Sequence, residues 1–138
     1  MAKSLFPEEM LESNSNTLTL ESIASKFDYF FQQIHLLHLQ TSSYSEHKAL
    51  QIWDSIPGIK DEFMEKLMGY EGRRLKSYKL ESLSDYSLGM SQKVIRDLAT
   101  FAKQLENYAK QKGYSDIENL SQSLNGSANS ILYLLTLS

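Results

Sequence analysis

The 138-residue chain contains no cysteine, only two prolines and a single tryptophan. The absence of cysteine excludes disulfide bonds and thiolate ligands, so a metal site in this chain must use imidazole and carboxylate groups. The sequence also has no apolar run long enough to cross a bilayer, and its first residues lack the apolar stretch of a signal peptide. We therefore expect a soluble, cytoplasmic protein that has no membrane partner.

Basic residues are fewer than acidic ones: the chain has 14 lysine and arginine residues and 17 aspartate and glutamate residues, which gives a net charge of −3. A protein that binds nucleic acid without sequence preference needs a clustered basic surface to displace counterions from phosphates. The sequence has no such cluster, so nucleic acid is not an expected partner. The length fits one domain. Residues 1–16 lack helical periodicity and are predicted to be a flexible N-terminal arm, whereas residues 17–138 are predicted to be the folded domain.

Apolar residues recur at helical spacing in four segments. The first helix is predicted over residues 19–41, with Thr19 as its N-cap. A second helix is predicted to start near Ser45, after the capping-box pattern of residues 43–46, and to run toward Gly72. Because proline removes one backbone donor, Pro57-Gly58 either kinks this helix or breaks it, and we expect the kink. The apolar phase also allows a different reading, one long helix from Thr19 to Ile56 that turns at Pro57-Gly58.

Residues 73–85 lack a periodic face and are predicted to be a connection long enough to cross a bundle from end to end. A third helix is predicted from about Leu88 to Lys112, where Gly113 favours its end. The pattern of residues 115–118 is a second capping box, and it predicts a last helix that runs to about Leu135. Short turn, long crossover, short turn is the connectivity of ferritin-like bundles. The predicted fold class is therefore all-α, a ferritin-like four-helix bundle with a long crossover between the second and third helices.

All three histidines, His35, His38 and His47, lie within thirteen residues, and an acidic pair, Asp61 and Glu65, follows them. These ligand types suit iron, zinc or manganese. At 100° per residue, His38 points into the apolar face of the first helix, His35 lies at its edge, and His47 shares an outward stripe with the two carboxylates. A metal site would therefore be completed between two chains. A hydrogen-bonded core histidine and a solvated polar face are the ordinary alternatives.

These residues resemble the Dps-type miniferritins of the ferritin-like superfamily. The twelve-residue step from His35 to His47 and the pair Asp61-x-x-x-Glu65 both follow that family's pattern, and the resemblance extends loosely from about Leu20 to the end of the chain. It implies an iron-oxidising site across a two-fold interface, to which one subunit gives the histidines and its mate the carboxylates. It also implies a homo-oligomer, either a dimer or a larger shell.

A longer string is more specific than this spacing: His35-x-x-His38-x-Gln-Thr-x-Ser-Tyr-x-x-His47-Lys-Ala-Leu50. It looks like a set of small phage-encoded proteins with a ferritin-like outline, which would place the protein in the host cytoplasm or the virion. Two departures from the miniferritin pattern matter. Gln51 stands where that family has an acidic residue, and the N-terminal segment is not basic, so DNA binding is not carried over. A short first turn would make His38, rather than His35, the equivalent ligand, and both remain candidates.

Two functions follow from the sequence. The first is a ferritin-like, Dps-like protein that binds iron, with zinc or manganese as alternatives, and that acts as a ferroxidase and iron store. The second is a non-enzymatic structural or interaction protein that keeps the bundle without a working metal site. Trp53, although close to the candidate ligands, is predicted to be a core or interface residue because tryptophan is usually buried.

Overall fold

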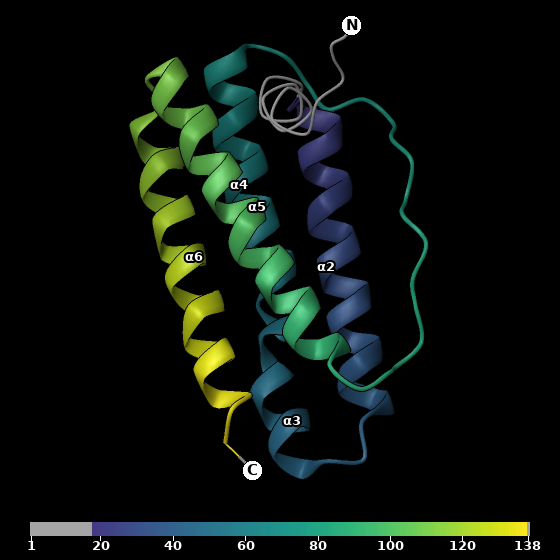
Figure 1. The fold of residues 1–138 in the computed structure, drawn as a ribbon. Helices are drawn as coiled ribbons and strands as arrows, with labels where there is room; N and C mark the ends of the chain where they lie inside the picture. The colour runs from purple at the N-terminus through teal and green to yellow at the C-terminus, as the bar shows by residue number, and fades with distance from the viewer. Residues whose placement is uncertain (1–17, 138) are drawn as a thin grey trace, which may run out of the picture.

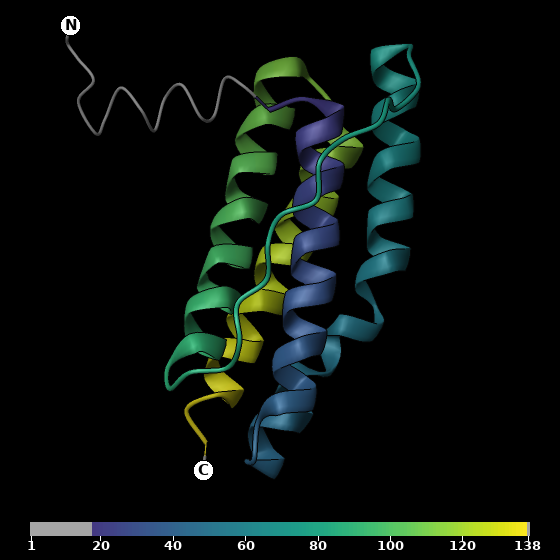
Figure 2. The same ribbon diagram turned by 90° about the vertical axis from the view of Figure 1, so that its right-hand side faces the viewer.

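The computed structural model describes residues 18–137, so the predicted arm of residues 1–16 lies outside the described part. Within that part every regular element is helical, and four long helices run side by side (Figures 1 and 2). The all-α, four-helix prediction is confirmed. None of the described helices is long and apolar enough to cross a membrane. The elements are α2 (Leu20–Gln40), α3 (Tyr44–Ala49), the 3₁₀ helix η1 (Leu50–Asp54), α4 (Ile56–Glu71), α5 (Met90–Lys112) and α6 (Ser115–Leu134).

The first helix, α2, begins as predicted. The Thr19 hydroxyl accepts the backbone N–H of Ser22 at 3.1 Å, and the Ser22 hydroxyl accepts the N–H of Thr19 at 2.9 Å. This reciprocal cap satisfies two of the backbone donors that a helix start leaves open. At the other end α2 stops at Gln40, and α3 starts only four residues later. The alternative of one long helix from Thr19 to Ile56 is therefore wrong.

The predicted second helix is divided into three pieces. The chain forms α3, tightens into η1, turns at Ser55 and begins α4 at Ile56. Pro57 lies in the first turn of α4, where its missing N–H has no helical partner to lose. The prediction of a kink at Pro57-Gly58 is therefore wrong, because the helix breaks before the proline and the proline helps to start the next one.

The segment between α4 and α5 is the long crossover. In Figures 1 and 2 it runs beside α2 over almost the full length of the bundle, from the end of α4 to the start of α5. Residues 74–87 have no regular secondary structure, which agrees with the predicted connection at 73–85. Gln33 of α2, which is fully buried, holds it by accepting the N–H of Ser84 at 2.8 Å and donating to the Ser84 carbonyl at 2.9 Å.

The turn between α5 and α6 follows the prediction only in part. Gly113 ends α5 with a φ of 75°, the left-handed conformation that glycine adopts readily. The predicted capping box at residues 115–118 is wrong, because Ser115 is already the first residue of α6 and Tyr114 is the N-cap. Tyr114 is held there by tertiary contacts, since its ring stacks on Tyr70 at 4.2 Å and its hydroxyl donates to Glu71 at 3.2 Å.

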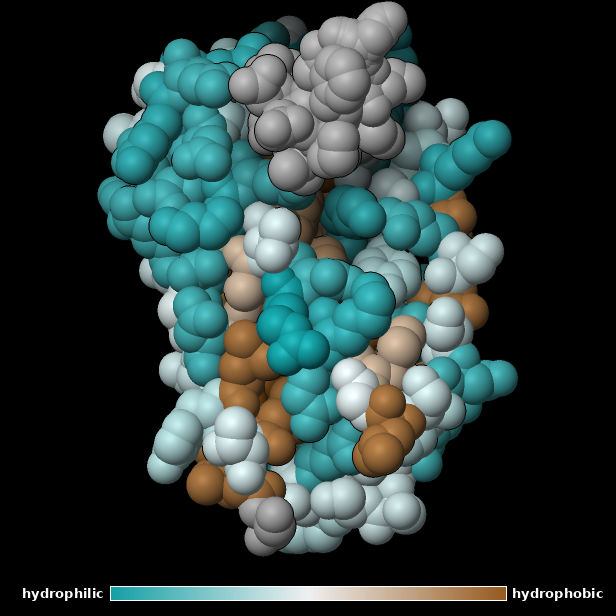
Figure 3. All heavy atoms as spheres, viewed as in Figure 1, coloured by the Kyte–Doolittle hydropathy of each residue, from teal (hydrophilic) through white to brown (hydrophobic). Residues whose placement is uncertain are grey.

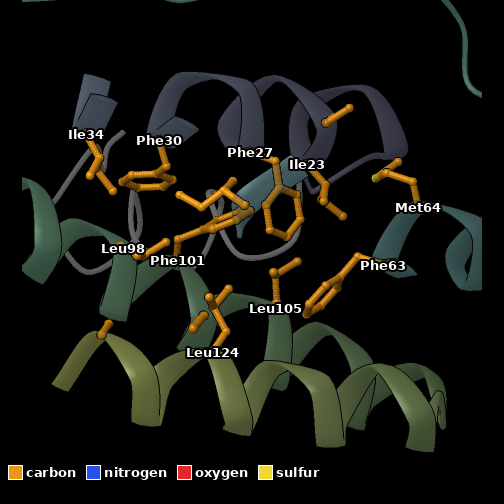
Figure 4. Close-up of a cluster of buried hydrophobic side chains, with 14 of the residues drawn as sticks. Ile23, Phe27, Phe30, Ile34, Phe63, Met64, Leu98, Phe101, Leu105 and Leu124 are labelled. Atoms are coloured by element: carbon orange, nitrogen blue, oxygen red, sulfur yellow. The ribbon is translucent and has the colours of Figure 1, made fainter. Parts of the chain in front are cut away.

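The core lies along the axis of the bundle and contains aromatic side chains from three of the long helices (Figure 4). The Phe27 ring lies 5.1 Å from that of Phe63 and 5.2 Å from that of Phe101, which also packs against Phe30. Burying each such ring contributes roughly 1.5–3 kcal/mol. This core holds α2 against α4 and α5, and it thereby fixes the end of α2 where the histidines lie.

Candidate functional site

Two histidines meet at the corner between α2 and α3. His38 is in the last turn of α2 and is 6% exposed, and His47 is in the last turn of α3 and is partly exposed. The turn between the helices is short because Thr41 caps α2 and Ser43 caps α3. The two imidazole rings therefore stack, with centroids 3.7 Å apart and an interplanar angle of 20°.

The backbone fixes the tautomer of both rings. Nδ1 of His38 lies 2.8 Å from the carbonyl oxygen of His47, and Nδ1 of His47 lies 2.8 Å from the carbonyl oxygen of His38. A carbonyl can only accept, so each Nδ1 must carry the hydrogen. In the neutral ring Nε2 then keeps its lone pair and points away from the bound carbonyl. Neither Nε2 makes a hydrogen bond to another residue in the described part of the chain.

The stacking limits what this pair can bind. A ligating imidazole nitrogen lies about 2.1 Å from its metal, which sits near the plane of the ring. Two nearly parallel rings with centroids 3.7 Å apart cannot both satisfy these conditions for a single ion. The residues present fit metal ligation through one imidazole per ion.

His35 is not part of this pair. Its ring stacks on Trp53 of η1, with centroids 3.9 Å apart and an interplanar angle of 17°, and it lies 6.2 Å from the ring of His38. The structure thus pairs His47 with His38 and places His35 against an aromatic neighbour. The helical phase correctly predicted the burial of these two side chains, since His38 is buried and His35 only partly so. Trp53 itself packs against the core, and its Nε1 is buried without a hydrogen-bond partner among the described residues.

The two candidate carboxylates lie on α4. Asp61 and Glu65 are one helical turn apart and exposed, as predicted. The predicted stripe that these carboxylates share with His47 is wrong, because His47 lies on the separate helix α3 and its ring stacks on His38. Within residues 18–137 no group of three or more histidine, aspartate and glutamate side chains is close enough to hold a metal ion. The five candidate ligands therefore do not assemble into one site inside the described chain.

A third acidic residue beside the histidines has a different role. Glu46 accepts hydrogen bonds from the hydroxyls of Thr41 at 2.8 Å, Tyr86 at 3.0 Å and Ser91. The bond to Glu46 and burial both raise the pKa of Tyr86. The predicted capping box is thus only half formed, because Ser43 accepts the N–H of Glu46 while the carboxylate binds the crossover and α5. Glu46 therefore anchors the corner between α2 and α3, where the histidine pair lies.

Sequence reasoning also missed a charged cluster beside the candidate carboxylates. Lys60 contacts Asp28 at 2.7 Å and Tyr78 at 3.0 Å, and the Tyr78 hydroxyl donates to Asp28 at 2.5 Å. Burial alone would lower the pKa of Lys60, but these hydrogen bonds outweigh it and raise the pKa. Asp28 and Lys60, together with Asp61, line a groove of about 200 Å³ between α2 and α4. The members of the cluster come from three distant segments, so no local pattern in the sequence points to it.

A protein-family model described as "Family of unknown function (DUF5856)" matches residues 38–135. The chain belongs to this family. The DUF5856 match begins at His38 and includes His47, Asp61 and Glu65, whereas His35 lies outside it. No curated protein and no solved structure matches the chain.

Proposed function

We propose that this DUF5856 protein is a ferritin-like, Dps-type metal-binding subunit that takes up iron, with zinc or manganese as alternatives. The observation that carries the proposal is the pair of hydrogen bonds from Nδ1 of His38 and His47 to backbone carbonyls. Metal-ligating histidines commonly donate their second ring N–H to a carbonyl or carboxylate, which fixes the other nitrogen as the ligand. Both Nε2 atoms are prepared in this way.

The proposed site is shared between two copies of the chain. One copy offers the Nε2 atoms of His38 and His47, and the other offers the carboxylates of Asp61 and Glu65. Because the stacked rings cannot bind the same ion, each imidazole serves a different ion. The helix order and the long crossover support a ferritin-like arrangement of this bundle.

Within this proposal, binding is favoured over fast oxidation. Bound iron would supply one-electron redox chemistry, but a di-iron centre usually has more carboxylates than Asp61 and Glu65 provide. Gln51 is exposed at the position where the miniferritin pattern has an acid, and its neutral amide adds no negative charge. We therefore expect metal to be held here with slow turnover.

Substitutions that remove the ligand atom and keep the fold test the proposal. His38→Asn and His47→Asn retain an amide N–H near the position of Nδ1, so they can keep the bond to the carbonyl while they delete Nε2. Each should weaken binding of Fe(II), measured anaerobically by calorimetry, by at least about tenfold. His35→Asn is the matched histidine control and should leave the affinity unchanged.

Mixing two inactive variants tests whether the site is shared. The carboxylate variant carries Asp61→Asn and Glu65→Gln, and the histidine variant carries His38→Asn and His47→Asn. Each alone should bind no Fe(II) at the site, whereas an equal mixture should recover about a quarter of the wild-type sites, because half of the random two-fold pairs regain one of two sites. Asp116→Asn removes an exposed carboxylate at the start of α6, outside the proposed site. It is the control for loss of negative charge and should bind Fe(II) as wild type does. Failure to recover any sites would rule out a shared site.

One observation favours a second candidate function, that of a structural or interaction protein without a metal site. The stacked rings and their two hydrogen bonds also join α2 to α3, so the histidine pair has a structural use without any metal. This candidate predicts that wild-type protein binds Fe(II) and Zn(II) no better than the histidine variant. The calorimetric comparison thus decides between the two functions.

A further inference from the structure

From Asn119 onward, the exposed face of α6 carries no charge. Charged residues make up 22% of the chain, yet none occurs after Glu118. The outer face of an exposed helix normally presents charged side chains to water, and depletion of charge is typical of the centre of a protein interface. From Asn119 onward, the exposed residues of α6 are uncharged, and they are Asn119, Gln122, Ser123, Gly126, Ser127, Asn129, Ser130, Tyr133 and Leu134. We call this set the uncharged α6 face.

Gly126 lies in the middle of the uncharged α6 face. Glycine is among the least favourable residues inside a helix, so its presence there calls for a packing reason. A Cβ atom added at Gly126 would meet no described atom within 4 Å, so the fold of this chain does not require a glycine. A missing side chain at the centre of an exposed face allows another backbone to approach closely.

Large apolar side chains lie at one end of the same face. Tyr133 is 64% exposed, Leu134 43% and Leu137, just beyond the helix, 49%. Figure 3 shows hydrophobic surface gathered toward this lower end of the molecule, near the C-terminal end of α6. Exposed tyrosine and leucine next to an uncharged helix face resemble the anchors of a binding surface.

We propose that the uncharged α6 face binds the same face of a second copy, with the two helices crossing in antiparallel orientation at Gly126. Around a two-fold axis each residue meets its own counterpart, so a charged face would bring like charges together and an uncharged one does not. Tyr133 and Asn119 are each seven residues, or two helical turns, from Gly126. Tyr133 of one copy therefore lies against the segment around Asn119 of the other, where an amide can bind its hydroxyl.

The size of this face predicts a weak contact. Residues 119–134 span about 22 Å of a helix that is about 10 Å wide. The area of this face is therefore much less than the roughly 800 Å² that each partner buries in a standard interface. A covalent trap suits such a contact better than the measurement of a stable dimer. The contact uses α6 and needs no metal, so it stands apart from the function proposed above.

The lack of cysteine makes the trap specific, because a single introduced thiol can pair only with a second copy. Ser127→Cys, next to the crossing point, should form a disulfide dimer under mild oxidation about tenfold faster than Asn107→Cys, since its thiols are held close together in the associated pair. Asn107 is an exposed residue of the neighbouring helix α5 and serves as the matched control. Equal rates for the two variants would overturn the proposal. A chelator in every reaction keeps the result independent of metal binding.

A second substitution tests the crossing point. Gly126→Lys added to Ser127→Cys blocks the close approach and places like charges at the axis, so dimer formation should slow to the rate of Asn107→Cys. Lysine is a better helix former than glycine and meets open space here, so the midpoint of thermal unfolding should not fall. Rapid dimer formation by this double variant would show that the helices do not cross at Gly126.

Discussion

At the scale of single residues, Glu21 joins the start of α2 to the chain that follows α4. Its carboxylate accepts two N–H groups of Arg73, at 2.7 and 2.8 Å, and the backbone N–H of Lys76 at 2.8 Å. The bonds from Arg73, followed by the one from Lys76, lower the pKa of Glu21 from 4.5 to about 2. The carboxylate therefore stays ionised in the folded protein to a pH at which it is protonated in the unfolded chain.

This difference predicts a pH-dependent effect of Glu21→Gln. A carboxyl group with a lowered folded pKa stabilises the fold above pH 4.5, and the contribution is lost as the pH falls toward 2. Wild type should therefore be more stable than the variant in urea at neutral pH, and the difference should shrink toward zero near pH 2. Glu62→Gln, at an exposed position of α4, is the control and should show little difference at either pH. A gap that stays constant across this range would contradict the prediction.

The histidines show which properties of single residues can be predicted from the sequence. Helical phase correctly predicted that His38 is buried and that His35 lies at an edge, because phase depends only on the helix to which a residue belongs. The reciprocal contact of His38 with His47 could not be predicted in this way. It depends on a turn that ends at Ser43 and on two rings that stack, which are properties of the assembled corner.

At the scale of elements, the ends of helices were predicted well where local chemistry decides them. The Thr19 cap and the Gly113 end are examples, because the deciding hydrogen bond or backbone conformation involves only nearby residues. The start of α6 was not predicted correctly, because the contact of Tyr114 with Tyr70 overrides the local capping pattern. The division of the second helix by η1 was also not predicted, because the local sequence does not distinguish such a break from a kink at the proline.

At the same scale, replacing glycine by alanine inside a helix should stabilise the protein. Gly126→Ala in α6 and Gly69→Ala in α4 both place a methyl group where no described atom lies within 4 Å. Each should raise the free energy of unfolding by about 0.5–1 kcal/mol, because alanine loses less backbone entropy on entering a helix. Urea unfolding of dilute protein measures this change. A loss of stability at either position would show that its surroundings are more crowded than the structure indicates.

At the scale of the whole molecule, the crossover closes the bundle along α2. Its existence and length were predictable, since residues 73–85 lack a helical face and must join the end of one long helix to the start of another. Its attachment was not, because Gln33 lies on the buried side of α2 among apolar residues and pairs with the backbone of Ser84, about fifty residues later. The sequence does not reveal such a partner, because the backbone N–H and carbonyl groups of Ser84 do not depend on its side chain.

The attachment can be tested by replacing Gln33 with methionine, which has a similar length but no amide. Gln33→Met removes both hydrogen bonds to Ser84 and should lower the free energy of unfolding by about 1–3 kcal/mol, because each bond contributes about 0.5–1.5 kcal/mol. It should also loosen the crossover, so that trypsin cleaves faster at the exposed Lys76 and Lys79. Ser84→Ala keeps the backbone groups that make these bonds and should change neither measurement. If Gln33→Met lowers stability but leaves the cleavage rate unchanged, Gln33 supports the core and does not hold the crossover.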